Sequence, residues 1–328
     1  MFIRISGGHK IKGIVYKVES KDFYVLSIPG NEKIRCSLKG KFKLDNSLKK
    51  DKQFKINIAV VGDKVEFDLN QDGTGVIYEI ASRRNYLSRK LPKVKGASYR
   101  GERLEQVIAS NVDNLMIVSS LMLPKFNNKL IDRIMVAGES SHLTIHLIIN
   151  KMDLASQDPP EFWIDLYSSI GYNVIPTSTK TFEGIDQIKS IMASKTNLFW
   201  GHSGVGKSSI INAMFPELQR KVGEISTFTQ KGKHTTVNSI MDKIDADTFL
   251  IDTPGIREID PYGITKENLG HYFVEFLPFI ENCRFNTCTH FHEPACGVIQ
   301  AVEDAEISFE RYESYLSLVN TIEDDMIF

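Results

Sequence analysis

The first part of the chain carries short clusters of apolar and β-branched residues separated by polar residues. The clusters predict five β-strands, at residues 11–18, 23–28, 34–38, 65–69 and 76–80. Turn signals lie between them at 29–31, 61–63 and 72–73. Five short strands in about 80 residues predict a small barrel of the oligonucleotide-binding (OB) type over residues 1–85. A lysine-rich stretch at 39–55 would form a loop, in which Phe42 and Phe54 are core residues or rings that stack on bases.

From about residue 104 the hydrophobic pattern changes to alternating strands and helices. Continuous apolar runs at 112–119 and 143–149 are typical of buried parallel strands. Further strands are expected at 173–175, 197–200, 239–242 and 248–251, with helices at 129–137, 162–170, 185–193 and 207–214. This alternation predicts an α/β domain with a doubly wound sheet over residues 104–261, which binds ligands at the carboxyl ends of its strands.

Two further segments complete the multidomain organisation that we expect. Residues 84–103 hold seven Lys or Arg and one acidic residue, together with a proline and two glycines. Weak hydrophobicity and self-repulsion predict a basic linker over residues 86–103, which becomes ordered on an anionic partner. Residues 262–328 are expected to form a helical C-terminal domain. One helix face in it is marked by Phe309, Tyr312, Leu316 and Val319.

Composition and charge narrow the class of protein. Of the 328 residues, 42% are hydrophobic and 25% are charged, as in ordinary globular proteins. Because there is no apolar run of membrane-spanning length and no apolar segment at the start, we expect a cytoplasmic protein without a membrane partner. The net charge of −1 hides an asymmetry, since residues 1–100 carry 22 Lys or Arg against 10 Asp or Glu, and residues 262–328 carry 3 against 12. The basic third indicates either a polyanionic partner such as RNA or a solvated surface rich in lysine.

The strongest chemical signal is a phosphate-binding loop that follows one of the expected strands. Its sequence, Gly-His-Ser-Gly-Val-Gly-Lys-Ser, fits a glycine-rich loop whose backbone N–H groups wrap the β-phosphate at a helix N-terminus. Lys207 should reach the β- and γ-phosphates, and Ser208 should bind Mg²⁺. The expected nucleotide contacts are Gly201, His202, Ser203, Gly204, Val205, Gly206, Lys207, Ser208 and Ser209.

A guanine-binding sequence, Asn-Lys-Met-Asp, follows directly after another expected strand. The carboxylate of Asp153 can accept hydrogen bonds from N1–H and N2–H₂ of guanine, whereas adenine lacks both donors. Asn150 would fix the loop and contact the base edge, the stem of Lys151 would cover the base plane, and Met152 completes the segment. Ser178 could support the base from behind. These residues indicate GTP rather than ATP.

A third motif, Asp-Thr-Pro-Gly, lies one strand further along. Asp252 would hold Mg²⁺ through water, and the N–H of Gly255 would meet the γ-phosphate. Between this turn and the phosphate loop, Thr235 and Thr236 offer hydroxyl groups to the same Mg²⁺. The guanine-binding sequence comes before the phosphate loop, whereas an ordinary Ras-like GTPase begins with the phosphate loop. The order of the motifs therefore predicts a circularly permuted GTPase.

Three cysteines and a histidine are crowded into the tail. The set follows the spacing C-x₄-C-x-H-x₅-C and consists of Cys283, Cys288, His290 and Cys296. A Cys₃His set suits tetrahedral structural zinc, and four protein ligands leave no open position for catalysis. His292 could replace His290 in this set. Disulfides are not expected for crowded cysteines in a cytosolic chain.

Together these motifs resemble the ribosome small subunit-dependent GTPase A family over essentially the whole chain. The similarity rests on the phosphate loop, the guanine-binding sequence, the Asp-Thr-Pro-Gly turn, their permuted order, the cysteine–histidine tail and the segment 105–113. It implies an RNA-binding OB-type barrel, a permuted GTPase and a helical zinc-binding domain. It also implies a factor in late maturation of the 30S ribosomal subunit, which binds 16S rRNA and hydrolyses GTP faster on that subunit. Thr179 departs from the family, in which a smaller residue is commoner.

The catalytic group is not the one that Ras-like enzymes use. In those enzymes a glutamine after the Asp-x-x-Gly glycine orients the attacking water. Ile256 occupies that position here and cannot do so. The best candidate is His234, beside Thr236, although it could also be a loop residue or an RNA contact. Catalysis is accordingly assigned to His234, Lys207 and Thr236.

Two other functions are compatible with the sequence. The first is an RNA-binding module that uses GTP only for structure, with negligible turnover, and Ile256 favours it. The second is a permuted GTPase that acts on the large subunit, against which only the resemblance argues. In each case we expect a monomer.

Overall fold

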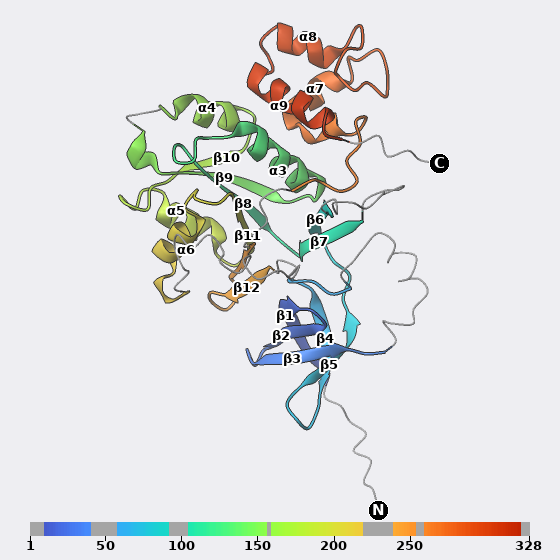
Figure 1. The fold of residues 1–328 in the computed structure, drawn as a ribbon, viewed down its shortest axis with the longest axis vertical. Coiled ribbons are helices and arrows are strands. Elements are labelled where there is room, and N and C mark those ends of the chain that lie inside the picture. The colour runs from blue at the N-terminus through green and yellow to red at the C-terminus, as the bar shows by residue number, and fades with distance from the viewer. Residues whose placement is uncertain are drawn as a thin grey trace, which may run out of the picture.

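The computed structural model describes residues 10–40, 58–91, 104–155, 159–218, 239–253 and 259–322. Three regions follow one another along the long axis of the molecule, namely a barrel near the N-terminus, a central α/β sheet and a helical region towards the C-terminus (Figure 1). Phe42 and Phe54 lie outside the described residues. Within those ranges, no helix has both the length and the apolar character needed to cross a bilayer.

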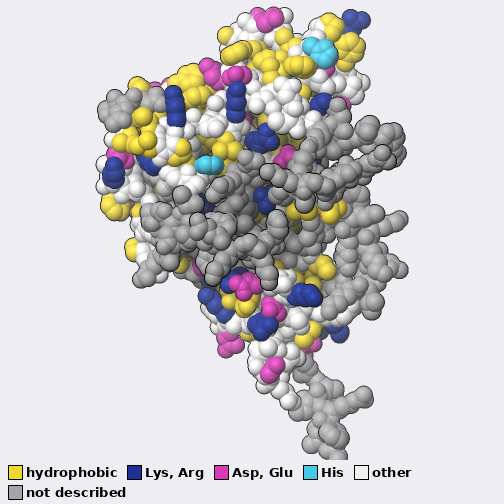
Figure 2. Space-filling view, viewed as in Figure 1, with side chains coloured by type: hydrophobic (Ala, Val, Ile, Leu, Met, Phe, Trp, Pro, Cys, Tyr) yellow, Lys and Arg dark blue, Asp and Glu magenta, His cyan; other side chains and the backbone are white. Residues whose placement is uncertain are grey.

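The N-terminal region is a closed five-stranded barrel, as predicted. Its strands are β1 (Ile11–Glu19), β2 (Asp22–Ile28), β3 (Lys33–Leu38), β4 (Lys64–Leu69) and β5 (Gly75–Ile80). They pair in the order β1-β2-β3-β5-β4, and β4 closes the barrel by pairing with β1. Val15, Val25 and Phe67 point into the barrel and are fully buried. Charged side chains of both signs lie among apolar and uncharged groups on the visible face of this region (Figure 2).

The central region contributes six strands, in the order β10-β9-β8-β11-β13-β12, to a sheet that continues from β12 into β1 of the barrel. Its strands are β8 (Asn114–Ser120), β9 (Thr144–Asn150), β10 (Asn173–Pro176), β11 (Thr196–Gly201), β12 (Ile240–Lys243) and β13 (Phe249–Asp252). The first five in this order are parallel, and β12 is antiparallel to β13. Strand β11, which precedes the phosphate loop, lies in the middle of the sheet although it comes late in the chain. This placement agrees with a permuted chain order.

Helices cover both faces of the central sheet (Figure 1). They are α3 (Asn128–Ser140), η1 (Met152–Leu154), α4 (Glu161–Ser169), α5 (Ile185–Met192), α6 (Lys207–Met214) and η2 (Pro216–Leu218). In β8, Leu115 and Ile117 belong to the core beneath α3 and α4. The alternating residues Met116 and Val118 belong to the core beneath α5 and α6. The strand is therefore buried on both faces, which explains its uninterrupted apolar sequence.

The basic linker predicted over residues 86–103 is wrong for its first part. Residues there form β6 (Tyr86–Lys90), which pairs antiparallel with β7 (Glu105–Ser110). Leu87 is fully buried between basic residues, and Nε of Arg89 donates to Oε1 of Gln106 at 3.1 Å. The high charge of this segment led to the prediction of a linker. The segment forms a strand instead, because its basic side chains find partners elsewhere in the fold. Residues 92–103 of the predicted linker lie outside the described residues.

The C-terminal region is helical, as predicted, and has its own core. Its elements are η4 (Leu269–Tyr272), η5 (Val274–Phe276), α7 (Leu277–Ile280), α8 (Gly297–Glu303) and α9 (Phe309–Val319). Phe273, Phe276 and Tyr315 are fully buried in contact with one another. Val136 of α3 belongs to the same core. The helical region is thus packed directly on the central region.

A buried ion network joins the helical region to the central region. The guanidinium of Arg311 on α9 contacts Oδ1 of Asp132 on α3, and its Nε lies 2.6 Å from Oε1 of Glu275. Tyr167 on α4 donates its hydroxyl to the same Asp132 oxygen at 2.7 Å. Arg311 is 1% exposed and Asp132 is fully buried. We call these four residues the helical-region joint.

A second network joins the barrel to the central region. The carboxylate of Asp63 accepts from Nε and Nη2 of Arg83, at 2.7 and 2.8 Å. It also accepts from Oγ of Ser110 on β7 at 2.7 Å and from the N–H of Val60 at 2.8 Å. We call these four residues the barrel joint. Close by, Gly62 has φ +94°, and a Cβ there would lie 2.1 Å from the carbonyl oxygen of Ser110, so only glycine fits.

Candidate nucleotide site and metal centre

The predicted phosphate loop connects the end of β11 to the start of α6. Gly204 and Gly206 have φ of +84° and +95°, which side chains rarely adopt. A Cβ on Gly206 would also lie 2.1 Å from Nδ2 of Asn150. His202 and Ser203 are exposed, while Lys207, Ser208 and Ser209 form the first turn of α6 and are partly exposed. The loop therefore has the strand–loop–helix setting in which backbone N–H groups can surround a phosphate.

Two side chains bring the guanine-binding sequence onto this loop. Nδ2 of Asn150 donates to the carbonyl oxygen of Val205 at 2.8 Å. Nζ of Lys151 donates to the carbonyl oxygen of Gly204 at 2.7 Å and also contacts that of Leu123. Asn150 is 1% exposed, and its Oδ1 has no hydrogen-bond partner among the described residues. The two motifs, about 50 residues apart in the chain, therefore share one site.

The carboxylate of Asp153 is oriented by two partners from the segment that follows the neighbouring strand β10. Oγ of Ser178 donates to Oδ1 of Asp153 at 2.8 Å, and Nζ of Lys180 lies 2.7 Å from Oδ2. The hydrogen bond from Lys180 lowers the pKa of Asp153, so the carboxylate is ionised at neutral pH. The N–H of Met152 donates to the carbonyl oxygen of Thr177 at 3.1 Å, which connects the two segments. The sequence analysis missed Lys180, although it lies only two residues after Ser178.

The third motif reaches the phosphate loop through the adjacent strand. Because β13 pairs parallel with β11, Asp252 lies beside Phe199 and its carboxylate contacts Nζ of Lys207. Oγ1 of Thr253 donates to the carbonyl oxygen of Phe199 at 3.0 Å. The side chains of Lys207 and Asp252 are only 13% and 10% exposed. A cationic and an anionic group thus meet at the carboxyl edge of the sheet, where phosphates and a divalent cation would be received.

Four residues of the predicted machinery lie outside the described residues, as does the apolar Ile256. The four are His234, Thr235, Thr236 and Gly255. Their expected contacts with water, Mg²⁺ and the γ-phosphate therefore stay predictions.

The Cys₃His set comes together in the helical region. One ligand atom from each of Cys283, Cys288, His290 and Cys296 lies within 4.8 Å of the other three. Nδ1 of His290 lies 3.5 Å from Sγ of Cys283 and 3.3 Å from Sγ of Cys296, and these two sulfurs are 3.8 Å apart. In a tetrahedral zinc site with Zn–S bonds of about 2.3 Å, ligand atoms lie about 3.5–3.8 Å apart. The four side chains therefore fit such an ion. His292, the alternative ligand, is exposed and is not part of the group.

The loop that carries these ligands is fixed by groups that the sequence analysis did not single out. Glu293 accepts from the N–H and Oγ1 of Thr289, at 2.7 and 2.5 Å, and from the N–H groups of Phe291 and His292. Burial alone would raise the pKa of Glu293, but these hydrogen bonds outweigh it and lower the pKa to about 2. The hydroxyl of Tyr312 on α9 donates to the carbonyl oxygen of His290 at 2.8 Å.

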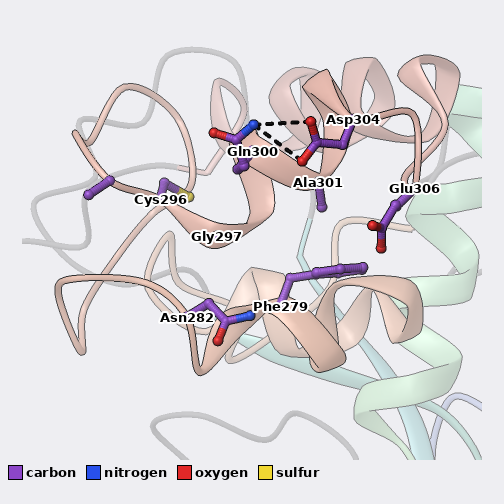
Figure 3. Close-up of a pocket in the computed structure, with 9 residues that line it drawn as sticks. Phe279, Asn282, Cys296, Gly297, Gln300, Ala301, Asp304 and Glu306 are labelled. Carbon is purple, nitrogen blue, oxygen red and sulfur yellow. Dashed lines mark hydrogen bonds between the residues drawn. The ribbon is translucent and has the colours of Figure 1, made fainter.

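A pocket between α7 and α8 is lined in part by Cys296, which also belongs to the Cys₃His group (Figure 3). Its lining includes the ring of Phe279 and the carboxylates of Asp304 and Glu306. Nε2 of Gln300 donates to the carboxylate of Asp304 across the rim. None of its lining residues belongs to the nucleotide-binding motifs, so this pocket is separate from the nucleotide site.

Known proteins resemble this chain along its whole length. The RsgA GTPase family model matches residues 80–262, and the RsgA N-terminal domain model matches residues 12–77. Small ribosomal subunit biogenesis GTPase RsgA 2 of Bacteroides thetaiotaomicron is 37% identical over 317 residues, covering 96% of this chain and 98% of that protein. RsgA of Chlorobaculum parvum is 36% identical, covering 96% and 99%.

Solved structures of related proteins also resemble this chain. YjeQ from Thermotoga maritima superimposes with a TM-score of 0.73 at 31% identity, covering 95% of this chain and 98% of that chain. YloQ, described as a circularly permuted GTPase, gives a TM-score of 0.69 at 28% identity, covering 99% and 100%. With the three GTP-binding motifs gathered at one edge of a permuted sheet, the chain belongs to the RsgA GTPase family.

Proposed function

We propose that the chain hydrolyses GTP to GDP and phosphate as a biogenesis factor of the 30S ribosomal subunit, and that the subunit stimulates this turnover. The observation that carries the proposal is the convergence of three separate motifs, through Asn150–Val205, Lys151–Gly204 and Lys207–Asp252. The printed names of the relatives, which refer to biogenesis of the small ribosomal subunit, support the choice of subunit.

We assign the recognition of GTP to three groups. The carboxylate of Asp153, oriented by Ser178 and Lys180, accepts from N1–H and N2–H₂ of guanine. The N–H groups of residues 201–209 surround the phosphates, and the ammonium of Lys207 neutralises the β- and γ-phosphates. The N–H of Gly255 donates to the γ-phosphate. Since Lys180 already pairs with Asp153, guanine must share or displace this partner.

We assign Mg²⁺ to the residues Ser208, Thr235, Thr236 and Asp252. Mg²⁺ supplies neutralisation of the charge on the phosphates. Of the four, Ser208 and Asp252 lie beside Lys207.

We assign the positioning of water to His234, supported by Thr236, because the apolar Ile256 cannot hydrogen-bond to water. The variant His234→Ala should bind GTP normally but lose subunit-stimulated turnover by about ten-fold or more. His234→Gln should recover part of this loss, because glutamine orients water in Ras-like enzymes. Unchanged stimulation in His234→Ala would remove His234 from the mechanism.

We assign zinc to the Cys₃His group. Four protein ligands close the coordination sphere, and burial lowers the pKa of His290, which favours the neutral imidazole that binds metal. The ion would therefore stabilise the helical region rather than take part in hydrolysis.

We assign 16S rRNA as the ligand of the basic N-terminal third and a monomer as the working form. Residues 1–100 carry 22 Lys or Arg against 10 Asp or Glu, which supports contact with a polyanion.

The test is GTP turnover by the zinc-loaded protein, alone and with purified 30S or 50S subunits at one salt concentration. Stimulation by 30S subunits only is expected. Stimulation by 50S subunits only would favour action on the large subunit. No stimulation by either would favour an RNA-binding module with negligible turnover.

A further inference from the structure

The pocket between α7 and α8 combines negative charge with an aromatic surface. Its volume is about 420 Å³, and none of the nine described residues that line it is basic. Two of them, Asp304 and Glu306, are acidic, and Phe279 supplies an aromatic ring. The carboxylate of Glu306 is turned towards that ring (Figure 3). We call this site the acidic pocket.

The end of α8 holds the two carboxylates of the acidic pocket in place. In the turn that ends this helix, the N–H groups of Glu306 and Ile307 donate to the carbonyl oxygen of Ala301, at 2.9 and 3.1 Å. Nε2 of Gln300 lies 3.2 Å from each carboxylate oxygen of Asp304, which orients that side chain without neutralising its charge. No basic side chain among the described residues pairs with either carboxylate. Both charges therefore remain available to a ligand.

The two helices that form the pocket are fixed relative to one another. A Cβ on Gly297 would lie 2.4 Å from the carbonyl oxygen of Phe279, so α7 and α8 approach closely there. Sγ of Cys296 accepts from the N–H of Ile299 at 3.4 Å, which ties the start of α8 to the Cys₃His group. A pocket with such fixed walls loses little conformational entropy when a ligand enters it.

The same region already binds one guanidinium with this combination of groups. Arg311 contacts the carboxylates of Asp132 and Glu275, and its Cζ lies 4.6 Å from the ring centroid of Phe273. A guanidinium suits such a site because its planar fork pairs with carboxylates while its face lies on an aromatic ring. The acidic pocket offers the same groups, two carboxylates and one phenylalanine ring, to a side chain of another molecule.

The charge of the helical region favours a basic protein segment over RNA. Residues 262–328 carry 3 Lys or Arg against 12 Asp or Glu. Such a surface repels phosphates and attracts arginine and lysine side chains. Proteins that bind RNA are rich in these side chains, because they neutralise phosphates. A ribosomal subunit, which is assembled from RNA and protein, therefore offers suitable basic segments.

We propose that the acidic pocket binds an arginine side chain of a basic protein segment. The guanidinium pairs with the carboxylates of Asp304 and Glu306 and lies over the ring of Phe279. The inference rests on the proposed function for the source of that segment, a protein of the 30S subunit. It gives the helical region a protein ligand, whereas the basic N-terminal third is assigned to RNA.

The probe is a short fluorescent peptide in which arginines alternate with glycine and serine. Binding is measured with the zinc-loaded full chain at about 0.15 M salt, where exposed charges more than about 8 Å apart are largely screened. One matched peptide carries citrulline, which keeps the shape of arginine without its charge, and another carries lysine. The arginine peptide should bind about five-fold more tightly than the lysine peptide, because an ammonium lacks the planar fork. The citrulline peptide should bind most weakly.

The variants remove either the charges or the ring of the acidic pocket. Asp304→Asn combined with Glu306→Gln should weaken binding of the arginine peptide about ten-fold, because the guanidinium loses both carboxylates. Phe279→Leu keeps an apolar side chain without the ring and should weaken binding about three-fold. The control combines Glu281→Gln with Glu303→Gln, which removes two exposed carboxylates outside the pocket, and should change the affinity less than about two-fold. The zinc content of each variant shows whether its helical region is folded.

Three results would overturn the acidic pocket as an arginine site. The first is equal peptide affinity in the pocket variant and the control variant. The second is binding of the lysine or citrulline peptide as tight as that of the arginine peptide. The third is loss of binding to a uridine oligonucleotide in the pocket variant while peptide binding stays unchanged, which would assign the pocket to RNA.

GTP turnover with 30S subunits is measured on the same preparations, so that the two proposals can fail separately. Normal stimulation of the unchanged chain together with any of the three results refutes the acidic pocket alone. Absent stimulation of the unchanged chain refutes the proposed function, whatever the peptides do.

Discussion

The barrel joint and the helical-region joint each place a buried carboxylate against an arginine, yet the two carboxylates are satisfied differently. Asp63 receives four hydrogen bonds, two on each oxygen. Asp132 receives Tyr167 and Arg311 on one oxygen, and its Oδ2 has no partner of good geometry among the described residues. Arg311 divides its side-chain N–H groups between two carboxylates. Arg83, in contrast, directs both Nε and Nη2 to the single carboxylate of Asp63.

The difference shows where each joint is vulnerable. In the barrel joint the central group is the carboxylate of Asp63, and removing its charge affects all four hydrogen-bond donors. In the helical-region joint the central group is the guanidinium of Arg311, because it is the counter-ion of two acidic side chains. The guanidinium also lies over an aromatic ring, with Cζ of Arg311 4.6 Å from the centroid of Phe273. Loss of a partner costs most where the remaining charges stay buried.

The largest effect is therefore expected at the helical-region joint. Arg311→Met keeps most of the volume but leaves Asp132 and Glu275 without their counter-ion. We expect a loss of about 3–5 kcal/mol in the free energy of unfolding. Urea unfolding followed by the fluorescence of Trp163 and Trp200 measures it, because Trp200 lies in the core that contains Tyr167 and Trp163 packs against that core.

The control for this variant is an exposed ion pair between the same two helices. Nζ of Lys129 lies 3.0 Å from Glu313, and the side chains are 45% and 51% exposed. Lys129→Ala should cost no more than about 1 kcal/mol. Equal losses in the two variants would mean that the buried network contributes no more than a surface pair, and the contrast between the joints would disappear.

A smaller loss is expected at the barrel joint. Asp63→Asn keeps the shape but removes the charge, and the amide turns a donor towards groups that are donors themselves. Since Arg83 is 16% exposed and can recruit water, we expect a loss of about 2 kcal/mol in the free energy of unfolding. Arg84→Ala, which breaks an exposed pair with Asp113, is the matched control and should change stability by less than about 1 kcal/mol. A larger loss than for Arg311→Met would reverse the comparison.

The nucleotide-binding motifs could be recognised in the sequence because each motif is a short local segment. A phosphate loop needs glycines at fixed positions before a helix, and Gly204 and Gly206 adopt the positive φ that explains them. The guanine-binding sequence and the Cys₃His set are likewise short segments whose residue types are dictated by their ligands. The strands of the barrel and the sheet were predictable from periodicity for the same reason.

The joints were not predictable, because each depends on residues far apart in the chain. Arg311 and Asp132 are separated by 179 positions, and either alone reads as an ordinary charged residue on a helix surface. Strand β6 was hidden by its own arginines and lysines, whose partners come from other segments. Lys180 pairs with Asp153 across 27 positions, so its role emerges only when β9 and β10 lie side by side. A single sequence carries no signal for such pairings.

The smallest expected effect on stability concerns an ionisable side chain of the central sheet, His146, which has no counter-ion among the described residues. Nδ1 of His146 on β9 accepts a hydrogen bond from Nδ2 of Asn173 at 3.0 Å, and its buried Nε2 has no partner among the described residues. Burial, and secondarily the charge of Lys195, lowers the pKa of His146 to about 4. The unfolded chain takes up this proton near pH 6.5, so the folded state loses stability as the pH falls from about 6.5 towards 4.

Between pH 7 and pH 5 the unchanged chain should therefore lose about 1–2 kcal/mol more than His146→Gln, in which the position no longer titrates. His142→Asn, which removes an exposed histidine from the adjacent turn, should keep the full pH dependence of the unchanged chain. Acid lability of the cysteine cluster is common to all three proteins and cancels from the difference. If His146→Gln and the unchanged chain follow the same pH profile, the buried imidazole is protonated in the fold. In that case ionisable groups inside the sheet would be as well compensated as those at the joints.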